Sequence, residues 1–298
     1  MTKPDYIVDA HHHLWDLNAC HYPWLMERGV PRFFGDPTPI QKDYLPADFS
    51  SDIGRLKVKK SVHIQVGVSS QDAVLETEWL QQVGNTSGCP DAIVAFCDLE
   101  LPSAARVLDA HQAHDRLRGI RQIVGRSAEE DRRSGTGALL DSRAFLDGLR
   151  MLQKRGLSFD LQLTPPLMNQ AAHCFGAVDD LPIALCHAGS LSDPSPDGLR
   201  EWSDGLKQLA ALPALICKMS GFGMFDRDWT IESIRPHVLT VIDIFGPDRI
   251  AFGSNFPVDK LNAPYARVMG AYLEITRDFS AIEINAMFAT TAETFYRI

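Results

Sequence analysis

The sequence of 298 residues predicts an α/β protein, a single (β/α)8 TIM barrel that spans residues 1–298 and carries a long loop after its first strand. Two observations predict it: eight short apolar runs, and stretches of helical periodicity between them. Parallel strands buried under helices have this alternation. A doubly wound open sheet is the alternative. It normally carries a Gly-rich nucleotide loop, whereas Gly221-Phe222-Gly223 is a lone glycine pair.

The elements follow one another along the chain. The first run, 6–13, reads Tyr-Ile-Val-Asp-Ala-His-His-His, and we expect the segment after it, 14–50, to fold over a pocket because it is long and rich in aromatic residues. The later apolar runs are 61–67, 92–99, 117–124, 157–163, 182–187, 214–220 and 249–254. Helical spacing predicts helices at 73–83, 103–114, 142–154, 199–209 and 231–245, and at about 281–296 to close the barrel.

Composition narrows the class of partner. The chain has 29 basic and 38 acidic residues, a net charge of −9, and no block of lysine or arginine, which argues against nucleic acid or an anionic membrane. No stretch of about twenty apolar residues and no signal peptide is present, so a cytoplasmic location is the default. The six cysteines show no CxxC spacing and are interpreted as reduced thiols. We expect a small-molecule substrate, and the oligomeric state, a homo-oligomer included, stays open.

Three histidines are the first candidates for chemistry. Side chains two apart on a strand share a face, so Asp9, His11 and His13 are predicted to project together while Ala10 faces the other way. His187 ends a later apolar run. Two imidazoles from one strand and a third from across a barrel suit a zinc-type site with an open position. Uncharged histidines can equally polarise a substrate without metal, and the residues leave both readings open.

Other polar residues also fall at predicted strand ends, among them Gln65, Arg121 and Asn255. Gln65 could instead complete hydrogen bonds inside the barrel. Lys218 stands within an apolar run, where it needs a carboxylate partner or a catalytic use. Aromatic residues of predicted loops would supply the apolar wall of a pocket for a small cyclic carbonyl compound; those assigned to the substrate site are Trp15, Trp24 and Phe222.

Several motifs together carry a resemblance to a known family. They are Asp9-Ala-His-His-His-Leu-Trp-Asp16, Tyr22-Pro-Trp-Leu25, Glu76-Thr-Glu-Trp-Leu80, Gly119-Ile-Arg-Gln122, His187-Ala-Gly189, Lys218-Met-Ser-Gly221 and Phe252-Gly-Ser-Asn-Phe-Pro-Val258. The chain resembles the amidohydrolase superfamily, amidohydrolase family 2, in its lactonase branch. That branch includes 2-pyrone-4,6-dicarboxylate lactonase, fuconolactonase and galactarolactone isomerase.

The resemblance implies roles for individual residues. His11 and His13 correspond to the His-x-His of strand one, His187 to the later histidine, and Arg121 to an arginine that meets the carbonyl or carboxylate of the substrate. Asn255 departs from the pattern, because the family usually has aspartate there as proton acceptor. An amide has no basic lone pair at neutral pH.

Another base is therefore required. The candidates are His11, His187 and Asp259, or a metal-activated water.

The sequence thus predicts a hydrolase that opens a lactone or similar cyclic ester of a small carbohydrate- or aromatic-derived compound. The catalytic set is His11, His13, His187 and Asn255, and the substrate-binding set is Arg121, Gln65, Lys218, Trp15, Trp24 and Phe222. The cofactor is one divalent metal such as zinc on the three histidines, or none. The alternatives are a lactone isomerase or aromatic-acid decarboxylase on the same barrel, and, because of Asn255, a non-catalytic small-molecule binder.

Overall fold

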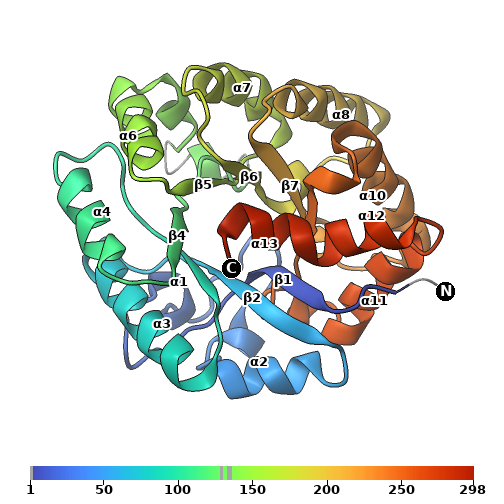
Figure 1. Cartoon of the computed structure of the whole chain (residues 1–298), viewed down its shortest axis with the longest axis horizontal. Coiled ribbons are helices and arrows are strands. Elements are labelled where there is room, and N and C mark those ends of the chain that lie inside the picture. The colour runs from blue at the N-terminus through green and yellow to red at the C-terminus, as the bar shows by residue number, and fades with distance from the viewer. Residues whose placement is uncertain (1–2, 128–129, 133–135) are drawn as a thin grey trace.

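The computed structural model describes residues 3–127, 130–132 and 136–298. Its centre is one sheet of eight parallel strands that pair in the order of the sequence (Figure 1). The strands are β1 (Ile7–His12), β2 (Val58–Ile64), β3 (Ala92–Ala95), β4 (Leu117–Ile120), β5 (Ser158–Leu161), β6 (Ile183–Leu185), β7 (Leu215–Met219) and β8 (Ile250–Phe252). A parallel bridge between His12 and Phe256 brings the two edges together, so the barrel is nearly closed. The predicted (β/α)8 fold is confirmed.

Helices surround this sheet (Figure 1). Those in the described chain are α1 (Pro23–Met26), α2 (Pro46–Ile53), α3 (Ala73–Ser87), α4 (Ala104–Gln112), α6 (Arg143–Lys154), α7 (Met168–Gly176), α8 (Pro196–Ala210), α9 (Phe222–Phe225), α10 (Ile231–Phe245), α11 (Tyr265–Ile275), α12 (Ala281–Asn285) and α13 (Thr291–Tyr296). A π-helix, Ala286–Thr290, joins the last two. Helical spacing predicted α3, α4, α6, α8, α10 and the C-terminal pair, but it missed α2, α7 and α11 and the one-turn helices α1 and α9.

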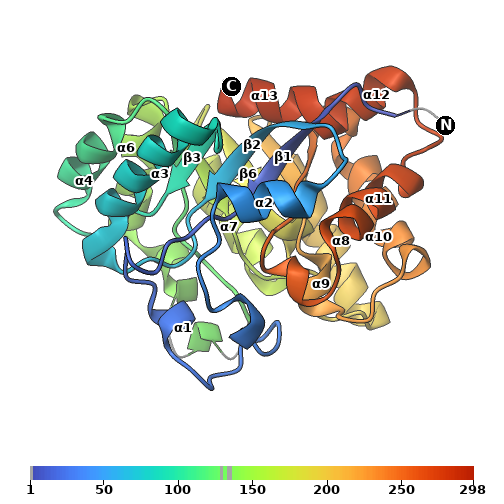
Figure 2. The same cartoon turned by 90° about the horizontal axis from the view of Figure 1, so that it is seen from below.

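Side chains of two sizes fill the two sides of the sheet. Large apolar residues such as Phe159 and Phe252 pack between the strands and the outer helices. The interior of the barrel holds smaller apolar residues, among them Val8, Ala10 and Ala251. The C-terminal segment packs Ala289, Ala292 and the larger Tyr296 against them. Figure 2 shows α12 and α13 on one side of the barrel and α1 with its loop on the opposite side. The C-terminal helix therefore closes one end and leaves the other for the loops.

The first strand departs from the simple alternation expected of it. Its pairing with β2 shifts register between Asp9 and His12. Ala10 lies in the barrel interior, whereas the Asp9 carboxylate accepts hydrogen bonds from the Tyr265 hydroxyl of α11 at 2.9 Å and the Ser254 N–H at 2.9 Å. The expectation that Asp9 shares a face with His11 and His13 was wrong, because a β-bulge interrupts the two-residue period.

Two further expectations concern the whole chain. All six cysteines are free thiols. No helix in the described part of the chain is both long enough and apolar enough to cross a membrane.

Candidate active site

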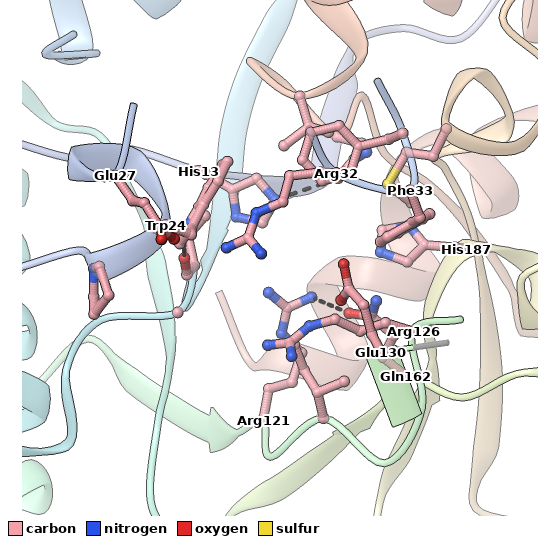
Figure 3. A pocket seen from close by; sticks show the side chains of 18 residues that line it. His13, Trp24, Glu27, Arg32, Phe33, Arg121, Arg126, Glu130, Gln162 and His187 are labelled. Atoms are coloured by element: carbon pink, nitrogen blue, oxygen red, sulfur yellow. Dashed lines mark hydrogen bonds between the residues drawn. The ribbon is translucent and has the colours of Figure 1, made fainter. Parts of the chain in front are cut away.

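A cavity of ≈ 270 Å³ opens at the carboxyl ends of the strands. His13 after β1, Arg121 after β4, Gln162 after β5, His187 after β6 and Asn255 after β8 all reach its wall. Figure 3 shows these side chains, where labelled, around one open space. The structure thus brings together four residues that sequence analysis assigned to the site from four different strands. This is the end of a (β/α)8 barrel where enzymes of this fold keep their chemistry.

His13 is an uncharged imidazole with a defined tautomer. Its Nδ1 lies 2.7 Å from the carbonyl oxygen of Ile64, which can only accept, so Nδ1 carries the hydrogen. Burial, and then the charge of Arg121, lower the pKa of His13 to about 3. The lone pair of Nε2 therefore faces the Asn255 side chain, whose Oδ1 is assigned at 3.2 Å. Turning the Asn255 amide over places Nδ2 there as a donor and satisfies both groups.

Asn255 links His13 to a buried carboxyl group. Its own backbone has φ of 56°, a left-handed conformation that asparagine tolerates, and its N–H donates to the His11 carbonyl at 2.7 Å. On its far side the amide lies 3.4 Å from Oδ1 of Asp259. Burial raises the pKa of Asp259 to about 7. A protonated Asp259 would donate to the turned amide, so the chain of three groups is consistent with one proton on Asp259.

His187 stands on a tight backbone turn after β6. His187 and Ala188 both have left-handed conformations, with φ of 55° and 50°. Nδ1 of His187 lies 3.0 Å from the Ser220 hydroxyl, and burial lowers its pKa well below the usual value. A Cβ on Gly221 would lie 2.6 Å from that same nitrogen. Ser220 and Gly221 therefore orient the ring and leave Nε2 toward the cavity.

Arg121 is held in place by protein acceptors. Its Nη1 donates to Gln162 Oε1 at 2.9 Å, and its Nη2 donates to the Gln65 carbonyl. The Gln65 side chain returns a bond from Nε2 to the Arg121 carbonyl at 3.2 Å. Among the described residues that line the cavity, Gln65 is absent, so the structure places it behind Arg121 as a support rather than at the wall.

His11 lies beneath the cavity wall. Its ring centre is 4.5 Å from that of His187 and 5.1 Å from that of His13. Burial, and then the charge of Lys218, lower its pKa well below the usual value, and both ring nitrogens are buried without a hydrogen-bond partner in the described part of the chain. Unpartnered imidazole nitrogens suit a divalent cation. Within residues 3–127, 130–132 and 136–298, however, no three His, Cys, Asp or Glu side chains stand in a ligating arrangement.

Lys218 lies inside the barrel and not at the cavity. Its side chain is fully buried and forms an ion pair with Asp160, which also accepts from the Tyr296 hydroxyl at 2.9 Å. The sequence left two roles open for Lys218, an ion pair with a carboxylate or a catalytic use, and the structure contains the ion pair. Lys218 was therefore wrongly predicted to bind substrate, because its side chain is used in the barrel interior, close to His11.

Of the three aromatic residues predicted for the substrate site, one lines the cavity and two do not. Trp24 lines the cavity and donates from Nε1 to the Val66 carbonyl at 2.5 Å. Trp15 is buried behind it, with Nε1 bonded to the Lys42 carbonyl at 2.6 Å. Phe222, the first residue of α9, packs near Tyr272 and is not among the described residues of the wall. Phe33, Phe34 and Met224 supply apolar surface there instead.

The family of the chain follows from comparison with known proteins. The sequence model of the protein family Amidohydro_2, whose description is amidohydrolase, matches residues 8–298. The chain belongs to this family. An uncharacterized protein, y4mH, of Sinorhizobium fredii is 40% identical over 298 residues, 98% of each chain. An L-fucono-1,5-lactonase of Burkholderia multivorans is 28% identical over 305 residues, 98% of this chain and 96% of the relative.

A solved structure agrees with that assignment. An amidohydrolase of Burkholderia multivorans with bound zinc superposes with a TM-score of 0.82 at 25% identity, over 98% of this chain and 99% of that one.

Four charged residues of this amidohydrolase-family protein reach the cavity without having been singled out from the sequence. Arg32 and Glu27 come from the segment after β1, and Arg126 and Glu130 from the segment after β4. Neither segment has a periodicity that fixes where a side chain points. The sequence showed only that these four residues lie in loops that follow a strand, and many other loop residues share that position.

Proposed function

We propose that this protein opens a small lactone, of carbohydrate or aromatic origin, by hydrolysis. The observation that carries the proposal is the set of uncharged His13 and His187 imidazoles and the oriented Arg121 guanidinium around one cavity at the carboxyl end of the barrel. Similarity to an L-fucono-1,5-lactonase over 98% of the chain supports the same reaction class. A lactone carbonyl needs a positive group at its oxygen and a base for the attacking water.

Arg121 and Asn255 are the groups proposed to meet the carbonyl oxygen. Arg121 is fixed by Gln162 and by the Gln65 carbonyl, so it needs no reorganisation when charge develops on the substrate. With its amide turned over, so that Nδ2 takes the place of Oδ1 beside His13, the nitrogen of Asn255 donates one hydrogen to His13 and has a second for the substrate. Asparagine is then useful as a donor at the position where it cannot act as a base.

His187 is proposed to be the base. Its Nδ1 lies 3.0 Å from the Ser220 hydroxyl, and when Nδ1 donates to that oxygen the lone pair of Nε2 is left to take a proton from water. Its lowered pKa keeps the ring uncharged at neutral pH, so the lone pair is unprotonated, and it also makes the imidazole a weaker base until charge develops on the bound substrate. The same imidazole can then return the proton to the alkoxide oxygen released when the ring opens, so no net proton is gained or lost by the enzyme.

A divalent cation such as zinc is a further part of the proposal. It would use the unpartnered nitrogens of His11, and Nε2 of His13 and of His187 would have to leave their present roles, because no three such side chains of the described residues stand in a ligating arrangement. When bound, such an ion supplies a Lewis acid and lowers the pKa of water. Elemental analysis of protein purified without added metal tests this part. One equivalent of metal in the native protein and a clear loss in His11→Ala are expected, and a native protein free of metal would contradict it.

The reaction is tested with a panel of sugar and aromatic lactones and product identification by mass spectrometry. Ring-opened hydroxy acid is the expected product, with kcat/KM reduced about 10³-fold or more in His187→Ala and Arg121→Gln. An isomeric lactone would indicate isomerisation, and carbon dioxide from an aromatic acid would indicate decarboxylation. Binding of a lactone without any product would make the protein a binder. Circular dichroism of each variant checks that it is folded.

A further inference from the structure

Three arginine side chains converge on the cavity, although the chain as a whole is acidic. Arg32 comes from the segment after β1, Arg121 directly from the end of β4, and Arg126 from five residues further on. In Figure 3 all three side chains point toward the same open space between His13 and His187. A net charge of −9 for the protein makes this local concentration of positive charge a feature of the site and not of the overall composition.

The three guanidinium groups are not equivalent. Arg121 is occupied by Gln162 and the Gln65 carbonyl. Arg32 lies with its guanidinium carbon 5.9 Å from the centre of the Trp24 ring. Within the described residues, neither Arg32 nor Arg126 forms a side-chain ion pair or hydrogen bond with another residue. Two forked donors therefore face the cavity with their hydrogen-bonding capacity unused.

The wall of the cavity carries more positive than negative side chains. Among the described residues that line the cavity, three are arginines and two, Glu27 and Glu130, are carboxylates. Burial lowers the pKa of Arg126, the charges of Glu130 and Asp131 raise it, and the charges of Arg121 and Arg32 lower it. Positive groups gathered in a partly enclosed space are stabilised by an anion that binds between them.

The cavity is suited to a compact anion. Its ≈ 270 Å³ is close to the lower limit of the range for small-molecule pockets, so a single ring with short substituents fills it. Trp24 and Phe33 border the same space as the two free guanidinium groups. A guanidinium group binds a carboxylate through two parallel hydrogen bonds, whereas a hydroxyl group uses only part of that fork.

We propose that Arg32 and Arg126 bind a carboxylate substituent of the substrate, so that the lactone taken is the cyclic ester of a dicarboxylic acid and not a neutral sugar lactone. The inference rests on the proposed lactone hydrolysis and adds the substrate class to it. Arg121 is left for the ring carbonyl, and the carboxylate lies toward the mouth of the cavity.

A matched pair of lactones tests this assignment. D-galactaro-1,4-lactone has a carboxylate at the carbon where D-galactono-1,4-lactone has a hydroxymethyl group, and the two are otherwise alike. The ratio of their kcat/KM values is expected to favour the carboxylate in the native protein and to fall by about 10- to 100-fold in Arg32→Gln and in Arg126→Gln, the range of a charge-assisted hydrogen bond. Arg28→Gln is the control, because Arg28 belongs to the same loop but donates to Gln41 at 3.1 Å.

Binding of the ring-opened acids separates this inference from the reaction itself. Calorimetric titration with galactarate, a dicarboxylate, and with galactonate, a monocarboxylate, measures recognition of the second carboxylate whether or not any lactone is hydrolysed. If no lactone turns over but galactarate binds more tightly, and loses that advantage in Arg32→Gln and Arg126→Gln only, then the reaction is wrong and the carboxylate site stands. The carboxylate site is overturned if Arg32→Gln and Arg126→Gln change neither the ratio of kcat/KM values nor the ratio of the two affinities. It is also overturned if the native protein prefers the neutral D-galactono-1,4-lactone.

Discussion

Asn255 is the residue at which this chain departs most from the expected chemistry of its site. It stands between the uncharged His13 and the buried Asp259, and the hydrogen-bonding capacities of the three groups agree when its amide donates to His13. An amide at this position acts as a donor and orients its neighbours. With the amide in that orientation, Asp259, four residues further along the chain, carries a proton, and burial favours this by raising the pKa of Asp259 to about 7.

Replacement of Asn255 by alanine is expected to lower kcat/KM for a lactone about 10²-fold, the contribution of one oriented donor. Asn169→Ala is the control, because Asn169 lies on α7 and is exposed. Steady-state kinetics of both variants measure the effect. Activity unchanged in Asn255→Ala would mean that the amide makes no contribution to the reaction, whereas a gain of activity in Asn255→Asp would identify the native protein as a weakened enzyme or a binder.

Asp259 predicts a pH dependence of stability. Its pKa is about 7 in the folded protein and about 4 in an unfolded chain, so the folded state retains the proton over that interval and the unfolded state releases it. The carboxyl group therefore lowers the free energy of unfolding as pH rises from about 4 to about 7, by up to about 1.4 kcal/mol per pH unit.

The isosteric variant Asp259→Asn isolates this contribution. Its free energy of unfolding, measured in urea, is expected to increase relative to that of the native protein as pH rises, and the difference is expected to level off above pH 7. A difference that stays constant between pH 4 and pH 8 would show that Asp259 is ionised in the folded state.

At the scale of single residues, the sequence predicted the part of the site that strands position. His13, Arg121, His187 and Asn255 each follow a short apolar run, and a (β/α)8 barrel brings the ends of such runs to one place. It could not predict where loop side chains point. Phe222 and Arg126 both lie in segments that follow a strand and were predicted as loops, yet Arg126 alone lines the cavity.

Among the elements, strands were easier to predict than helices, for a physical reason. A strand of a parallel barrel is buried on both sides, so its apolar run is continuous and visible. Helices α7 and α11 were missed although each buries apolar residues at helical spacing, such as Met168, Ala171 and Phe175 of α7, and α2 begins at Pro46 within a segment that had been assigned to a loop. The bulge in β1 was beyond reach because bulges depend on the partner strand.

The turn from β7 to α9 gives a prediction at this scale. Gly221 has φ of +71°, and a Cβ there would lie 2.6 Å from Nδ1 of His187. Gly221→Ala is therefore expected to displace the imidazole and lower kcat by at least about tenfold, together with a loss of about 1 kcal/mol in stability.

Gly88→Ala is a matched control for that variant. Gly88 has φ of +78° at the end of α3, but a Cβ there would have no atom within 4 Å. It carries the same backbone strain without the clash, so it is expected to lose similar stability and no activity. Equal kcat in the two variants would contradict a role of the turn in placing His187.

The contacts of the C-terminal helix and the residues that line the cavity lie at opposite ends of the barrel axis. The C-terminal helix reaches into the barrel from the end opposite the loop that carries α1 (Figure 2), and its Tyr296 hydroxyl binds the Asp160 carboxylate, which in turn pairs with Lys218. The histidines and arginines of the cavity stand at the other end. Lys218 is the link, because its charge lies close enough to His11 to lower the pKa of that imidazole.

This arrangement predicts that stability and activity can be changed independently. Tyr296→Phe removes the hydroxyl that lies 2.9 and 3.2 Å from the two Asp160 oxygens, and the loss of one buried hydrogen bond is expected to cost about 1–2 kcal/mol of unfolding free energy. The ion pair with Lys218 stays in place, so kcat/KM is expected to remain within about twofold of the native value. Urea unfolding and steady-state kinetics on the same preparation measure the two quantities. A large fall in kcat/KM with little loss of stability would instead mean that the closed end of the barrel communicates with the cavity through Asp160 and Lys218.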